Sequence, residues 1–115
     1  MIFGGKSNGD EKLDSFIEFD IQSNKWKNSL LKLSEPKSGF GCAVSNNRLY
    51  IAGGSNNMKS LKSFEEYRIS GLGLCKVDLA PMNHSRDELG MVMGYDGYIY
   101  ACGGINESGS VLSSC

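Results

Sequence analysis

The sequence predicts an all-β fold built from repeated four-stranded antiparallel sheets, and three observations lead to this prediction. Three short apolar runs, MIFGG, RLYIAGG and YIYACGG, each end on a pair of glycines. The second glycines of the pairs, Gly5, Gly54 and Gly104, are 49 and 50 residues apart, which indicates an internal repeat. Apolar residues at helical spacing, with capping residues beside them, are absent from the sequence, so strands are favoured throughout.

Each period is expected to contain four strands in the same order. In the middle period, the strands at 39–44 and 49–54 are joined by the turn SNNR, and the corresponding turn in the next period is YDGY. Asn-Asn and Asp-Gly suit the left-handed positions of a tight hairpin turn. A polar loop, a strand at 63–69, a short Ser/Gly turn and a strand at 73–79 complete the period.

The run LYIAGG is apolar at successive positions, so both faces of its strand are expected to be covered. Sheets packed radially around an axis, as in a β-propeller, provide that environment. A glycine pair at the end of such a strand lets another backbone or a ring approach closely. We therefore assign a structural role to the six paired glycines, which are Gly4, Gly5, Gly53, Gly54, Gly103 and Gly104.

Other residues recur with the same step. Phe19 aligns with Tyr67, and Lys37 aligns with Arg86, 49 residues later. The aromatic residues Phe19, Trp26 and Tyr67 are predicted to be buried rings between neighbouring sheets, because large rings fill such layers.

With these features the sequence resembles the kelch-repeat β-propellers. The family pattern has a Gly-Gly pair, then an aromatic residue, then a Trp, then a basic residue before the next first strand, and the link LAPMNHSRDELG is similar to those of kelch repeats attached to BTB domains. The resemblance implies a partial blade at 1–36, a complete blade at 37–82 and a partial blade at 83–115. It also implies that the chain is a segment of a larger propeller.

The resemblance further implies a protein-interaction module whose rim is formed by loops and links. The rim segments are 6–12, 55–61 and 105–110, together with the links 36–38 and 85–88. Lys37 and Arg86 are expected to meet the carboxylates of an acidic, extended peptide. Alternatively, these two residues only brace the strand entry by satisfying carbonyl groups of adjacent loops. The expected partner-binding residues are Lys37, Ser38, Asn56, Asn57, Arg86, Asp87, Glu88, Asn106 and Glu107.

Two partner classes follow from the family likeness. One is a cullin-type ubiquitin ligase, for which the chain would be part of a substrate adaptor, and the other is actin. The chain has 12 basic and 13 acidic residues and no basic run, which argues against nucleic acid as a partner. It has no apolar run long enough to cross a membrane, and a cytoplasmic location is expected.

Catalysis is not expected. A kelch-type copper enzyme needs clustered ligands, whereas His84 is the single histidine and is expected at the surface. The neighbouring carboxylates Glu65 and Glu66 are expected to point to opposite faces of a strand, so they cannot share a reaction centre. No catalytic residue, metal or cofactor is therefore assigned, and a kelch-type propeller enzyme is kept only as an alternative.

The cysteines are expected to be reduced. Cys42, Cys75, Cys102 and Cys115 lack the short spacing of a zinc site. Cys42 and Cys102 lie in apolar runs, where a free thiol behaves as a small hydrophobic group. A disulfide is the alternative.

Overall fold

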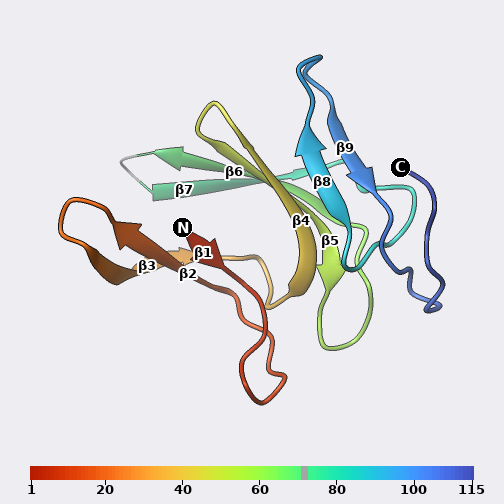
Figure 1. Ribbon diagram of the computed structural model, residues 1–115, viewed down its shortest axis with the longest axis horizontal. Coiled ribbons are helices and arrows are strands. Elements are labelled where there is room, and N and C mark those ends of the chain that lie inside the picture. The colour runs from red at the N-terminus through yellow and green to blue at the C-terminus, as the bar shows by residue number, and fades with distance from the viewer. Residues whose placement is uncertain (71–72) are drawn as a thin grey trace.

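The computed structural model describes residues 1–70 and 73–115, and these residues form antiparallel β-sheets without a helix (Figure 1). Hydrogen bonding joins the strands into sheets with the orders β1-β2-β3, β4-β5-β6-β7 and β8-β9. The all-β class with blade-like antiparallel sheets is confirmed, and the ring of sheets is not closed. The strands are β1 (Ile2–Phe3), β2 (Ser15–Asp20), β3 (Lys25–Lys32), β4 (Ser38–Ser45), β5 (Arg48–Ser55), β6 (Phe64–Ser70), β7 (Gly73–Leu79), β8 (Gly90–Met93) and β9 (Ile99–Cys102).

The middle sheet has the four-strand order predicted for a complete period. Asn46 and Asn47, in the β4–β5 turn, have φ angles of 49° and 60°, the left-handed conformation expected there. The Ser/Gly turn expected between β6 and β7 includes residues 71–72, which lie outside the described residues. The three sheets fall within the segments 1–36, 37–82 and 83–115, whose assignment as blades stays a prediction.

The sheets follow one another across the molecule, with β1–β3 at the lower left of Figure 1, β4–β7 in the centre and β8–β9 at the upper right. The main core lies between the first two sheets, where Phe16, Ile51 and Tyr67 are at most 1% exposed. Phe3 stacks between the rings of Phe16 and Phe40, with centroid distances of 4.9 and 5.5 Å. Burial of these large side chains stabilises the contact between the sheets.

The second and third sheets meet where β4 faces β8. A Cβ atom on Gly41 would lie 2.7 Å from the Cβ of Met91, so the missing side chain lets β8 approach β4. The middle sheet therefore contacts the first sheet with one face and the third sheet with the opposite face.

The three glycine pairs share one conformation. The φ angles are 64°, 65° and 71° at the first glycines and 90°, 85° and 88° at the second. A Cβ atom on Gly54 would lie 2.6 Å from the carbonyl oxygen of Ser38, and one on Gly104 would lie 2.5 Å from that of Asp87. At these two positions another backbone approaches closely, as predicted from the sequence. A Cβ atom added to Gly5 or Gly103 would have no neighbour closer than 3.8 Å, so the prediction of a close approach does not hold for these two glycines.

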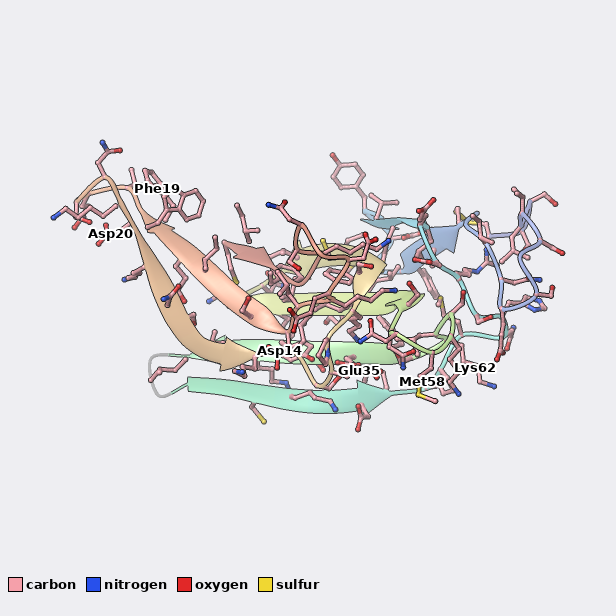
Figure 2. The ribbon with its side chains drawn as sticks, turned by 90° about the horizontal axis from the view of Figure 1, so that it is seen from below. Asp14, Phe19, Asp20, Glu35, Met58 and Lys62 are labelled. Atoms are coloured by element: carbon pink, nitrogen blue, oxygen red, sulfur yellow. A yellow bond between two sulfur atoms is a disulfide. The ribbon has the colours of Figure 1, made fainter. Side chains whose placement is uncertain are left out.

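Two of the three predicted inter-sheet rings are exposed. Tyr67 is fully buried, whereas Phe19 is 39% and Trp26 56% exposed. Phe19 and Trp26 pack on each other, with ring centroids 5.0 Å apart, at the end of the β2–β3 hairpin that extends beyond the middle sheet in Figure 2. The first sheet covers Tyr67, but no described sheet covers Phe19 at the equivalent position. The prediction that Phe19 and Trp26 are buried is therefore wrong for this structure.

The prediction that the cysteines are reduced is wrong for Cys102 and Cys115 but holds for Cys42 and Cys75. Cys102 and Cys115 form a disulfide, and the free cysteines Cys42 and Cys75 are exposed. In the middle sheet, the residue before the glycine pair, Ala52, lies directly opposite Phe64 on the neighbouring strand. Cys102 and Cys115 take the same two places in the third repeat, so their side chains face each other across adjacent segments.

Candidate functional site

The loops that follow the glycine pairs are held in the same way in every repeat. A leucine seven or eight residues after the second glycine donates its backbone N–H to that glycine's carbonyl oxygen. The distances are 2.9 Å for Leu13, 2.7 Å for Leu61 and 2.8 Å for Leu112. Sequence reasoning missed these leucines, although their recurring distance from the glycine pair was a detectable signal.

Lys37 points into the protein and is fully buried. Its ammonium Nζ lies 2.8 Å from Glu65 Oε1, and the hydroxyl groups of Ser34 and Tyr67 also donate hydrogen bonds to the Glu65 carboxylate. This network fastens the link after the first sheet to β6 of the middle sheet. The prediction that Lys37 contacts a partner is wrong, because a partner cannot reach its charge.

Arg86 has the same role one repeat later and is 5% exposed. Its guanidinium donates to the carbonyl oxygens of Gly103 at 2.8 Å and Ser114 at 2.9 Å, and to Ser114 Oγ at 2.7 Å. The predicted partner contact of Arg86 is wrong for the same reason, and Ser38, at 8% exposed, is likewise enclosed. The bracing alternative, in which carbonyl groups are satisfied, is found for Arg86. Lys37 braces the structure as well, but through the Glu65 carboxylate and not through carbonyl groups.

Four other predicted rim residues lie outside the groove described below. Asn56 donates to Glu35 Oε2 at 3.0 Å, and its own side-chain oxygen accepts hydrogen bonds within its loop. Asn57 and Glu88 are exposed, and Asp87 is half-buried. Asn56 thus shapes a loop, and the others lie at the surface or partly beneath it.

The loop edge of the second and third repeats forms an open groove of about 790 Å³. Asn106 and Glu107, both predicted rim residues, line it, and Lys59 lies within the predicted rim segment 55–61. Lys62 and His84 were not predicted to belong to a site, although His84 is exposed as expected. The lining residues are Lys59, Ser60, Leu61, Lys62, Ser63, Pro81, Asn83, His84, Ser85, Asn106, Glu107 and Ser108.

Hydrogen bonds fix the shape of this groove. The N–H of Glu107 donates to Ser85 Oγ at 3.1 Å and so joins the third-repeat loop to the link before β8. The side-chain oxygen of Asn106 accepts from the N–H groups of Ser108 at 3.1 Å and Ser110 at 2.9 Å. The loop is therefore ordered before any partner binds, which lowers the entropy cost of binding.

The groove carries more positive than negative charge. Lys59 and Lys62 are exposed and contribute two ammonium groups, against one carboxylate from Glu107. The chain as a whole has a net charge of −1, so this balance is local. The arrangement can attract a ligand that carries carboxylates.

The carboxylates of Glu65 and Glu66 occupy separate environments, as expected from their positions in one strand. Glu65 is paired with Lys37, whereas Glu66 lies 3.3 Å from Arg48 and 3.2 Å from Arg68. Residues 1–70 and 73–115 contain no group of three or more His, Cys, Asp or Glu side chains placed to hold a metal ion. Over the same residues, no helix has the length and apolar character needed to span a membrane.

Comparison with known families places a motif on the middle sheet. Residues 36–70 match the family model of the Kelch motif, and no curated protein sequence matches the chain. The matched segment begins beside the buried Lys37, contains the Gly53–Gly54 pair and includes β4, β5 and β6. The kelch motif identified from the sequence is confirmed over these residues.

Proposed function

We propose that the chain is a non-enzymatic protein-interaction module that binds an acidic, extended segment of a partner protein in the groove. The kelch motif supports an interaction module in general. The finer assignment rests on one observation: two exposed lysines stand beside a groove whose loops are already ordered. Pro81 adds exposed apolar surface between the polar groups.

Lys59→Ala and Lys62→Ala are each expected to weaken binding of an Asp/Glu-rich peptide about 1.5- to 5-fold, the range for exposed charge pairs. Fluorescence anisotropy with the labelled peptide at two salt concentrations measures this, and affinity should fall as salt rises. The matched control is Lys76→Ala, which removes a lysine of β7 outside the groove.

If Lys76→Ala lowered the affinity for the acidic peptide as much as the groove variants do, this result would contradict the proposed binding site. Equal affinity for the acidic peptide and for its Asn/Gln counterpart would contradict the ligand class. Thermal unfolding of each variant separates lost binding from lost folding.

We further propose that the partner class is either a substrate presented to a cullin-type ubiquitin ligase or actin, and that the protein acts in the cytoplasm. Co-purification with ligase subunits or with filaments distinguishes the two partner classes. In the cytoplasm a disulfide is usually transient, so alkylation of protein from lysed cells should label Cys102 and Cys115. A persistently oxidised pair would contradict the proposed location.

A further inference from the structure

The groove between the second and third repeats has a filled counterpart between the first and second repeats. There, Lys12 Nζ donates hydrogen bonds to the carbonyl oxygens of Ser55 at 3.1 Å and Asn56 at 3.0 Å. The side-chain amide of Asn56 in turn donates to Glu35 Oε2 at 3.0 Å. A lysine and a glutamate of the chain itself therefore occupy this place, which we call the first junction.

Ser60 has at the groove the position that Lys12 has at the first junction. Lys12 forms an isolated antiparallel β-bridge with Lys6, the residue that follows the first glycine pair. Ser60 forms the same bridge with Ser55 one repeat later, and it lines the groove. Because a serine side chain is too short to cross to the next loop as Lys12 does, space remains at the groove.

Two further groove residues correspond to the hydrogen-bonded pair of the first junction. Asn106 stands two residues after its glycine pair, as Asn56 does, and the side-chain oxygens of both accept N–H groups of their own loops. His84 aligns with Glu35 in the register of the repeat. The groove therefore keeps the amide of the first junction but has an imidazole in place of its carboxylate.

The Asn106 side chain is held so that its NH₂ group is the end left for a ligand. Its Oδ1 accepts hydrogen bonds from the N–H groups of Ser108 and Ser110 and, at 2.8 Å, from the Ser108 hydroxyl. The NH₂ group of an asparagine can only donate. Asn106 therefore presents to the groove a donor of the kind that binds a carboxylate at the first junction.

The charges beside the two places are opposite. Two residues before the leucine that follows the glycine pair, the first repeat has Glu11 and the second has Lys59. One residue after that leucine, the first repeat has Asp14 and the second has Lys62. The groove thus has positive charge and a carboxylate-binding amide, but no carboxylate of its own in the position of Glu35.

We propose that Asn106 and His84 form a carboxylate-binding subsite of the groove, an inference that rests on the proposed function and makes it more specific. One aspartate or glutamate side chain of the bound segment takes the place that Glu35 takes at the first junction. Its carboxylate accepts a hydrogen bond from the Asn106 NH₂ group, and an N–H of the His84 imidazole can donate a second. The neighbouring lysines attract the same charge.

Two-dimensional proton–nitrogen NMR of the isotope-labelled chain tests the subsite directly. The NH₂ signals of Asn106 are identified by their loss in Asn106→Ser, and an Asp/Glu-rich peptide should shift them, whereas its Asn/Gln counterpart should not. The NH₂ signals of Asn56 are the internal control and should stay in place, because this amide is already bonded to Glu35. Asn106 signals that do not move while the acidic peptide is bound overturn the subsite.

Asn106→Ser is expected to weaken binding of the acidic peptide about 3- to 10-fold, the range for one hydrogen bond in a partly exposed site. Serine keeps a side-chain oxygen for the N–H groups of the loop, and Ser7 is the natural residue at this position of the first repeat. The two loops also share a backbone bond, from Asp10 N–H to the Ser7 carbonyl at 3.1 Å and from Gly109 N–H to that of Asn106 at 3.0 Å. Asn56→Ser is the matched control and should leave the affinity unchanged.

His84→Glu returns the carboxylate of the first junction to the groove. It should weaken peptide binding more than Asn106→Ser does, and it should shift the Asn106 NH₂ signals without any peptide. Far-UV circular dichroism checks that each variant is folded. Unchanged affinity in both variants, together with a loss in Lys62→Ala, would overturn the subsite and leave the proposed function standing. A chain that binds no acidic peptide at all would overturn both.

Discussion

Replacing Lys37 with alanine is expected to lower the free energy of unfolding by about 3–5 kcal/mol, the usual cost of leaving a buried charge without its partner. The side chains of Lys37 and Glu65 are 0% and 4% exposed, so water cannot solvate the Glu65 carboxylate in place of the lysine. Ser34 and Tyr67 still donate hydrogen bonds to this carboxylate but supply no positive charge. Urea denaturation at a concentration where the chain is monomeric measures the change.

An exposed ion pair provides the matched control. Lys27 lies 3.9 Å from Glu18, and these side chains are 60% and 33% exposed, so Lys27→Ala should cost less than about 1 kcal/mol. Replacing Lys37 by Met together with Glu65 by Leu should be much less harmful than Lys37→Ala, because no buried charge remains. A Lys37→Ala variant as stable as Lys27→Ala would show that the pair does not fasten the two sheets.

The same network sets a pH dependence. Burial raises the pKa of Glu65, but hydrogen bonds from Lys37, Tyr67 and Ser34 and the charge of Lys37 outweigh this effect, so the pKa of Glu65 lies below its usual value. Because the pKa of Glu65 is lower in the folded chain than in the unfolded chain, the ionised carboxylate stabilises the fold at pH values above the unfolded-state pKa. This stabilisation is lost as the pH falls through the folded-state pKa. Burial and the hydrogen bond to Glu65 raise the pKa of Tyr67 to about 12. The protonated Tyr67 hydroxyl therefore stabilises the fold fully below pH 10, and this stabilisation is lost as the pH rises towards 12.

The repeat register and the strand order could be predicted from the sequence because they rest on local signals. Gly53 and Gly54 mark a strand end by their own conformational freedom, and Asn46 and Asn47 mark a turn for the same reason. Each of these signals requires only a few neighbouring residues. The positions of β4, β5 and β6 therefore followed from the sequence, and the kelch motif lies on them.

The directions of side chains in the links could not be predicted in this way. Lys37 and Arg86 lie between sheets, where a long side chain can turn outward or reach forward into the next sheet. The decisive acceptors, Glu65 for Lys37 and Ser114 for Arg86, are both 28 residues further along the chain. Phe19 was misjudged for a related reason, because its burial depends on a neighbouring sheet and not on its own strand.

The candidate groove was predicted in part. Asn106 and Glu107 were identified because they follow a glycine pair. Lys62 lies just before a strand and His84 lies in a link, and neither segment contains a chemical motif that would have marked it. The groove arises where these segments of two repeats meet. Such a meeting depends on how the second and third sheets pack, which no single stretch of sequence specifies.

Gly53→Ala is expected to lower the free energy of unfolding by about 2–5 kcal/mol, from two separate costs. The φ angle of Gly53 is +65°, a conformation that costs an L residue about 1–2 kcal/mol. An added Cβ would also collide with the carbonyl oxygen of Arg86 and lie 3.1 Å from side-chain carbons of Leu89 and Met82. Crowding of this kind in a packed region costs about 1–3 kcal/mol.

The Arg86 carbonyl cannot easily move aside, because it accepts the N–H of Gly54 at 2.7 Å. Gly103 provides the control, since it occupies the same place in the third repeat with φ of +71°, yet the atom nearest an added Cβ is 3.8 Å away. Gly103→Ala should therefore cost only the conformational part, about 1–2 kcal/mol. The difference between the urea midpoints of the two variants measures the cost of the contact between the added Cβ atom and the Arg86 backbone. Equal losses at Gly53 and Gly103 would mean that glycine is required there for its φ angle alone, and that the close approach of the Arg86 backbone does not constrain the repeat.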